Sequence, residues 1–147
     1  MKKIFCFVII AAMVLAACQP KIQPVVVDLN ASKAEVNALM ETYLTAWNAK
    51  DVNTLIFMIA EDGLYCGTDP TELMDKKTIS EAWKQVFSDS TTNIVFTVDK
   101  REIRVVSNGE SALIMEQHIA NPYTPEIPWR LVSHAVKTAD GWKLDFK

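Results

Sequence analysis

Residues 93–147 decide the fold, because four segments there alternate apolar and polar residues in the manner of β-strands. The segments are NIVFTVDKREIRVV (93–106), SALIMEQHIA (111–120), PWRLVSHAVKT (128–138) and GWKLDFK (141–147). The turn signals SNG (107–109) and ADG (139–141) and the proline-rich stretch NPYTPEIP (121–128) separate them. Connections this short join antiparallel neighbours, so we expect one antiparallel sheet.

Three segments upstream carry apolar residues at the three- and four-residue spacing of amphipathic helices. Ser32 to Glu35 fits a capping box that would begin the first helix, and Thr78 to Glu81 fits one that would begin the third. Asp51 can cap the second helix, whose buried face would include Ile59. The predicted fold class is therefore α+β, with the sheet covered by three N-terminal helices.

The first seventeen residues read as a signal peptide. Lys2 and Lys3 precede an apolar run, Ile4 to Ala17, that is too short to span a bilayer as a helix. The run ends in Leu15-Ala16-Ala17-Cys18, which resembles the lipobox of bacterial lipoproteins, where the cysteine becomes the lipidated first residue. An ordinary secretory signal is the alternative. The lipoprotein reading implies membrane attachment through acyl chains on Cys18.

The expected organisation has three parts: a leader (1–17), the lipidated Cys18 with a tether (18–31), and one domain (32–147). Gln19 follows the cysteine, and this resembles lipoproteins sorted to the outer membrane, facing the periplasm. Loss of the leader lysines takes the formal net charge from −3 to −5. The sequence contains no basic run, which disfavours a nucleic-acid partner.

Three stretches resemble the SnoaL-like, or nuclear transport factor two-like, superfamily. They are METYLTAWNAKDV (40–52), LYCGTDPTE (64–72) and DGWKL (140–144), and their order matches the expected helices and strands. The resemblance implies a cone-shaped, curved sheet whose concave side forms a pocket, and a homodimer built on the sheet's other face. The family's last strand commonly continues to a polar His or Ser near the pocket, whereas this sequence stops at Asp145-Phe146-Lys147. The family includes isomerases, cyclases, dehydratases and members without known catalysis, so it predicts no single activity.

Period-two alternation sorts the faces of the expected strands. Phe96 and Ile103 have opposite parity, so we expect a β-bulge between Asp99 and Arg101. On the next strand Glu116 and His118 share a face, and on the third strand Arg130 and His134 do. If these two strands pair, His118 or Glu116 could lie near Arg130 or His134. A histidine beside a carboxylate can act as a general acid or base, but alternating polar residues also mark a solvated or dimer-facing side.

Several further residues are candidates for a ligand pocket, each beside a plainer structural role. Large aromatic side chains are core by default, or they line a cavity; these are Trp47, Trp83 and Phe87. Tyr65 could point its hydroxyl into the same cavity, together with Arg130 and His134. Asp69 lies in a turn-prone GTDP stretch, where a role at the pocket mouth is the alternative to turn chemistry.

The sequence predicts no cofactor and no metal site. Cys66 would be the one free thiol after lipidation of Cys18, and a single thiol in a strand is usually packed. The two histidines and Cys66 have no metal-ligand spacing, and no phosphate-binding or nucleophile motif is present.

Three functions remain open at this point. The first is a lipid-anchored envelope protein that binds a small, largely apolar molecule without catalysis. The second is an isomerase, cyclase or dehydratase that uses His118, His134, Glu116 or Asp69. The third is a non-catalytic dimeric assembly module. We expect the first, together with a homodimer.

Overall fold

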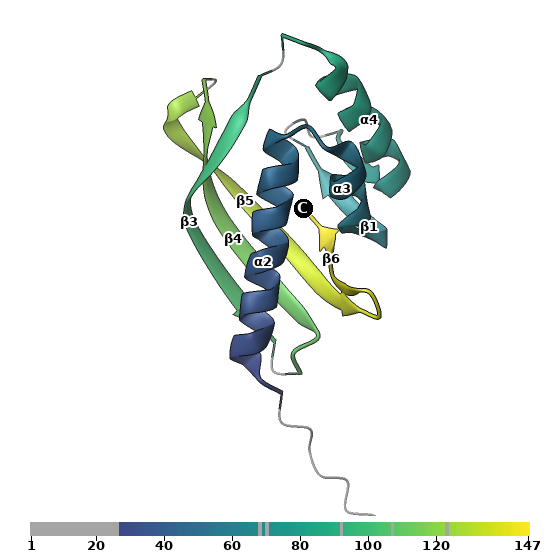
Figure 1. The fold of residues 1–147 in the computed structure, drawn as a ribbon, viewed down its shortest axis with the longest axis vertical. Coiled ribbons are helices and arrows are strands. Elements are labelled where there is room, and N and C mark those ends of the chain that lie inside the picture. Colours follow the sequence, from purple (N-terminus) through teal and green to yellow (C-terminus); the bar gives the residue numbers. More distant parts are fainter. Residues whose placement is uncertain (1–26, 68, 70, 92, 107, 123) are drawn as a thin grey trace, which may run out of the picture.

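Three helices cover one face of a curved, open sheet (Figure 1). The structure is a computed structural model that describes residues 27–147 except 68, 70, 92, 107 and 123. The expected leader, Cys18 and the tether as far as residue 26 lie outside the described residues. The α+β fold class, with a curved sheet and covering helices, is confirmed.

Six strands build the sheet in the order β2-β1-β6-β5-β4-β3. They are β1 (Ile59–Cys66), β2 (Leu73–Asp75), β3 (Val95–Val105), β4 (Ser111–Asn121), β5 (Thr124–Thr138) and β6 (Gly141–Phe146). The four strands expected from residues 93–147, β3 to β6, pair antiparallel as predicted. β1 pairs antiparallel with β2 and parallel with β6. β5 begins earlier than expected and takes in part of the proline-rich stretch, after a cis peptide bond between Asn121 and Pro122.

The β-bulge expected near Asp99 is present. The register between β3 and β4 shifts between Val98 and Lys100. The bulge changes which residues of β3 face the helices: Phe96 does so before it, and Arg101 and Ile103 do so after it. It therefore turns Arg101 inward, opposite Glu116 of β4.

Two of the three expected helix starts are wrong, in both cases because an upstream aspartate caps the helix. α2 (Leu29–Asn48) begins at Asp28, whose carboxylate accepts from the Asn30 and Ala31 amides, and Ser32 is buried one turn later. α4 (Lys76–Ser88) begins at Asp75, which accepts from the Thr78 amide. An N-cap carboxylate satisfies amides that lack a partner within the helix.

The second helix starts as predicted but ends sooner. Asp51 caps α3 (Val52–Phe57) by accepting from the Thr54 amide. Ile59 was expected on this helix, but it lies in β1. The Met58 carbonyl accepts a hydrogen bond from the Leu144 amide, and this bond directs the chain along β6.

The core lies between α2 and the sheet. It includes Val36 and Met40 of α2 with Ile103, Ile114 and Leu144 of the strands. Trp142 of β6 also packs in the core, with 7% of its surface exposed. At the C-terminal end of α2, Asn48 both donates to and accepts from the Phe96 backbone, at 2.8 and 2.9 Å, and so ties the helix to β3.

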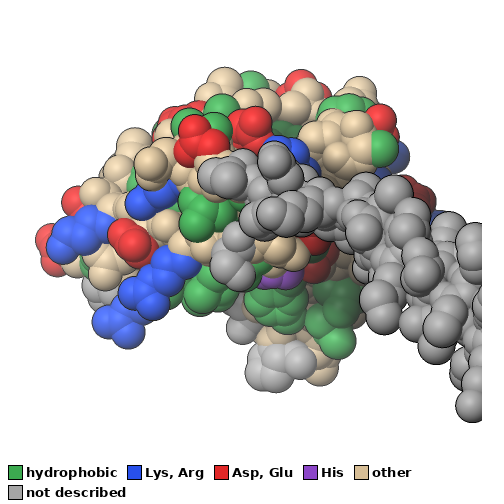
Figure 2. Space-filling view, turned by 90° about the horizontal axis from the view of Figure 1, so that it is seen from below, with side chains coloured by type: hydrophobic (Ala, Val, Ile, Leu, Met, Phe, Trp, Pro, Cys, Tyr) green, Lys and Arg blue, Asp and Glu red, His purple; other side chains and the backbone are tan. Residues whose placement is uncertain are grey.

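The outer surface shows no large area of one charge on the face seen in Figure 2. Lys and Arg side chains are mixed there with Asp and Glu, and hydrophobic side chains gather beside a histidine. The absence of a nucleic-acid partner stays a prediction, as does the homodimer on the sheet's outer face. Within the described residues, no helix combines the length and apolar character that a membrane crossing requires.

Candidate functional site

A cavity of about 560 Å³ lies between the helices and the inner face of the sheet. Its lining comes from α2, α4 and all six strands and includes Tyr43, Leu44, Trp47, Tyr65, Met74, Ile79, Ala82, Trp83, Phe96, His118, Trp129, Arg130, Leu131, Phe146 and Lys147. Ligand pockets of proteins commonly have volumes of roughly 300–1,000 Å³. The cavity is therefore large enough for a small organic molecule.

Aromatic side chains form much of its apolar wall. The Trp47 and Trp83 rings meet edge-on with centroids 5.8 Å apart, and Tyr65 meets Trp83 at 5.4 Å. Across the cavity, Phe96 lies 5.7 Å from Trp129. Trp47, Tyr65 and Trp83 thus line the cavity, and their contact with a ligand stays a prediction.

Phe87 was also expected in the pocket, but it is not among the lining residues. Its ring packs edge-on against Trp47 at 5.1 Å, so it supports the wall from behind. The edge-on contacts of this cluster are typical of aromatic packing.

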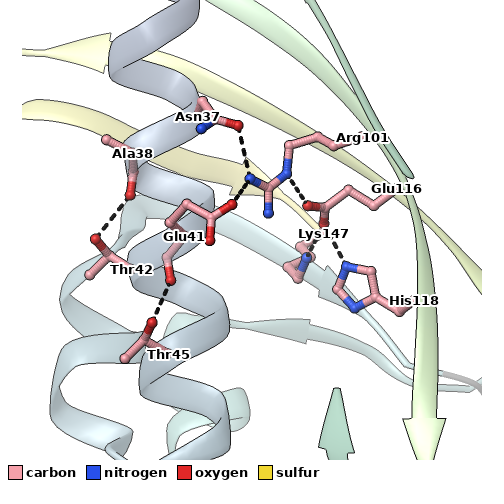
Figure 3. Close-up of polar contacts among 9 residues, drawn as sticks. All are labelled: Asn37, Ala38, Glu41, Thr42, Thr45, Arg101, Glu116, His118 and Lys147. Carbon is pink, nitrogen blue, oxygen red and sulfur yellow. Dashed lines mark hydrogen bonds and ion pairs between the residues drawn. The ribbon is translucent and has the colours of Figure 1, made fainter. Parts of the chain in front are cut away.

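A buried polar cluster lies at the β4 side of the cavity (Figure 3). Glu116 accepts from Nε of Arg101 at 2.5 Å through one oxygen, and its other oxygen lies 2.9 Å from Nε2 of His118. The side chains of Glu116 and His118 are 1% and 5% exposed. His118 also lines the cavity, whereas Glu116 lies behind it.

Arg101 joins this cluster to α2. Its Nη1 donates to Asn37 at 2.9 Å and to Glu41 at 2.5 Å (Figure 3). The guanidinium is 8% exposed, whereas Glu41 is 59% exposed and lies at the surface. A single side chain therefore connects the helix, the bulged strand β3 and the carboxylate on β4.

The ionisation of Glu116 reflects two opposed causes. Burial raises the pKa of its carboxyl, but the hydrogen bonds from His118 and Arg101 and the positive charge of Lys147 outweigh burial and lower that pKa. Glu116 is therefore a carboxylate at neutral pH, held by three basic side chains.

Lys147, like Tyr43 and Arg101, is a site residue that the sequence did not reveal. Its ammonium lies 3.3 Å from the Ser133 hydroxyl, 3.9 Å from Glu116 and 4.4 Å from the centre of the Tyr43 ring. Burial lowers the pKa of Lys147 to about 8. The positive charge of Arg101 lowers this pKa further, whereas the negative charge of Glu116 raises it. Lys147 directly follows β6 and brings a polar group to the cavity. The expectation that this end of the sheet lacks a polar contribution to the pocket is therefore wrong.

The expected meeting of His118 or Glu116 with Arg130 or His134 does not occur. In the register of β4 and β5, Glu116 faces Leu131 and His118 faces Trp129, so Arg130 and His134 lie on the opposite face. His134 instead lies 2.7 Å from Asp145, half-exposed and away from the cavity lining. Arg130 is exposed and is one of the lining residues.

The loop between β1 and β2 uses its acidic residues for its own structure. Asp69 accepts from the amide and hydroxyl of Thr71, and Glu72 accepts from the Asp69 amide. The two hydrogen bonds from Thr71 lower the pKa of the Asp69 carboxyl. Asp69 is thus placed in a turn, which is the plainer of its two expected roles, while Cys66 and Glu72 line the cavity.

The arrangement supplies few means of chemistry beyond proton transfer. Within the part of the chain that is described, no group of His, Cys, Asp and Glu residues could hold a metal ion. The Cys66 thiol is exposed, without a disulfide partner among those residues. Among the described residues, His118 and Glu116 form an acid–base pair at the cavity: His118 lines it, and Glu116 lies behind His118.

A curved sheet, covering helices and an apolar cavity between them define the nuclear transport factor two-like class of α+β domains. The chain belongs to the SnoaL-like domain family, whose model matches residues 36–145. None of the curated proteins matches the chain.

Three solved structures illustrate the similarity of fold. A protein of unknown function from Pseudomonas putida superposes with a TM-score of 0.70 at 16% identity, covering 80% of this chain and 84% of its own. A candidate aromatic ring hydroxylase from Novosphingobium aromaticivorans has a TM-score of 0.68 at 15% identity, and the match covers 79% of this chain and 85% of the hydroxylase chain. A candidate dehydratase from Streptomyces avermitilis has a TM-score of 0.64 at 13% identity, and the match covers 81% of this chain and 95% of the dehydratase chain. Identities this low establish the fold alone.

Proposed function

We propose that this protein binds a small, largely apolar molecule in the cavity of its SnoaL-like domain, without turning it over. The observation that carries the proposal is the cavity itself: about 560 Å³, with a wall made largely of tryptophan, tyrosine and phenylalanine rings. Apolar pockets with a few polar groups at one end are the usual form of small-molecule sites. Burial of the ligand's apolar surface would provide most of the binding energy.

The polar cluster supports binding over catalysis. Glu116 already holds Arg101, His118 and Lys147, so it serves to join α2 to the sheet. The second candidate is an acid–base enzyme, favoured by the contact of His118 with both Glu116 and the cavity. A ligand recovered from the protein in chemically altered form would favour this second candidate.

Filling the cavity tests the proposal. Ala82 of α4 lines the cavity, whereas Gln85 is exposed on the same helix. Ala82→Trp should reduce the small molecule that co-purifies with the protein by about ten-fold or more, which needs only about 1.4 kcal/mol of lost affinity. Gln85→Trp, the matched control, should leave the amount unchanged. Equal amounts in both variants, measured by solvent extraction and mass spectrometry, would place the ligand elsewhere.

We also propose that the domain is attached to the cell envelope by lipid on Cys18, at the outer membrane and facing the periplasm. The support is the apolar run that ends at Leu15-Ala16-Ala17-Cys18. Cys18→Ser should move the protein from the membrane fraction to the soluble fraction, because it removes the thiol that carries the lipid. A variant that stays with the membranes would contradict the anchor.

A further inference from the structure

The polar end of the cavity contains a hydrogen-bond donor without an acceptor. Tyr43 lines the cavity and is 4% exposed, and its hydroxyl has no hydrogen-bond partner among the described residues. Burial raises the pKa of Tyr43 well above its usual value, so the hydroxyl keeps its proton and can donate. A buried polar group left unpaired is costly, and a bound ligand can remove that cost.

Lys147 adds further donors at the same end. Its side chain is 5% exposed, lines the cavity and lies over the Tyr43 ring at 4.4 Å. An ammonium has three N–H groups. Ser133 accepts one of them at 3.3 Å, and the Glu116 oxygen at 3.9 Å is beyond hydrogen-bond distance. Lys147 therefore has donor capacity that the described residues leave unused.

The charges of the buried side chains at this end are unequal. Among the described side chains, Arg101 and Lys147 are two cations that are 8% and 5% exposed, and Glu116 is the one buried anion that contacts them, at 1% exposed. The other anionic partner of Arg101 is Glu41, which lies at the surface and is 59% exposed. His118 adds no negative charge in either protonation state. A ligand with one negative charge would compensate the excess.

We propose that the ligand is a hydrophobic monocarboxylate. Its carboxylate would accept hydrogen bonds from the Tyr43 hydroxyl and the Lys147 ammonium, and its apolar part would pack between Trp47, Trp83 and Trp129. This inference rests on the proposed function of the cavity and adds to it the chemical class of the ligand.

Two probes that differ in charge test the inference: 1-naphthoate and 1-naphthylmethanol, which share one ring system. Binding is measured by tryptophan fluorescence on the full chain at one fixed concentration of a mild detergent. Each probe partitions into detergent equally in every sample, so the ratio of dissociation constants between variants is unaffected. Charge-assisted hydrogen bonds contribute enough that Lys147→Met should weaken naphthoate binding by about 10- to 100-fold. The affinity for the alcohol should change by less than about three-fold, because the alcohol carries no charge for the ammonium to bind.

Two more variants separate this role from a structural one. Tyr43→Phe removes a single oxygen and keeps the ring, and it should weaken naphthoate binding by about five- to ten-fold. Lys147→Arg keeps the positive charge and should retain the preference for naphthoate over the alcohol. Melting temperatures of all variants show whether the fold is kept.

The outcomes distinguish the inference from the proposal beneath it. In one outcome, both probes bind to the wild type, while Lys147→Met weakens their binding equally or leaves both unchanged. That result would overturn the inference that the ligand is a carboxylate, and it would leave the cavity as a binding site. No binding of either probe up to millimolar concentration would contradict the proposed function and this inference together.

Discussion

Replacing Trp142 with alanine should lower the free energy of unfolding by about 3–5 kcal/mol, the range for loss of a buried tryptophan or phenylalanine side chain. Trp142 is 7% exposed in the core between α2 and β6. Its indole N–H donates to Glu35 of α2 at 2.8 Å, and Lys137 lies over its ring at 5.7 Å. The substitution therefore opens a cavity and removes one of the hydrogen bonds between Glu35 of α2 and the sheet, while the bond from Lys137 to Glu35 remains.

Trp142→Phe is the matched control for this prediction. It keeps most of the buried ring and removes the hydrogen bond to Glu35, which is half-exposed, so a cost of about 1–2 kcal/mol is expected. Urea unfolding at neutral pH measures both variants. A loss below about 1 kcal/mol for Trp142→Ala would mean that the residue does not support the core.

The second large effect is expected for Arg101→Met, which should also cost about 3–5 kcal/mol, as removal of one partner from a buried ion pair does. The substitution keeps an apolar side chain but leaves Glu116 without its shortest ionic contact and α2 without its link to β4 (Figure 3). Glu41→Gln alters the exposed partner of the same guanidinium and should cost less than about 1 kcal/mol. Similar losses for the two variants would contradict a structural role for the buried pair.

Acid unfolding gives a second measure of Arg101→Met. The lowered pKa of Glu116 stabilises the fold above the usual carboxyl pKa of 4.5, and this stabilisation is lost as the pH falls through the lowered value. Without Arg101, one cause that lowers the pKa is gone while burial still raises it. The acid midpoint of the variant should therefore lie at a higher pH than that of the wild type.

The periodic features of the sequence predicted the fold well. Strand alternation placed β3, β4 and β6 and the bulge at Asp99, because each depends on local patterns that the sheet preserves. The helix starts at Ser32 and Thr78 were wrong because two capping signals lay close together and the upstream aspartates, Asp28 and Asp75, cap the helices. Sequence spacing alone does not rank one good cap above another.

The polar cluster could be predicted only in part. The alternation of residues along β4 correctly placed Glu116 and His118 on one face. Their neighbours on β5 depend on the register between the two strands, which pairs Glu116 with Leu131. The inward direction of Arg101 depends on the exact residue at which the bulge falls. Lys147 belongs to the site because the end of β6 lies beside β1, where the Lys147 amide donates to the Leu64 carbonyl. These are tertiary relations that a single sequence does not specify.

Native mass spectrometry of the full chain, purified from its own host and released gently from detergent, shows whether the cavity holds a small molecule. We expect protein carrying additional mass that dissociates on activation as one small, mostly apolar compound, recovered unaltered. Protein of bare polypeptide and lipid mass, with no dissociable compound under conditions that preserve the fold, would contradict the claim that the cavity binds a small molecule.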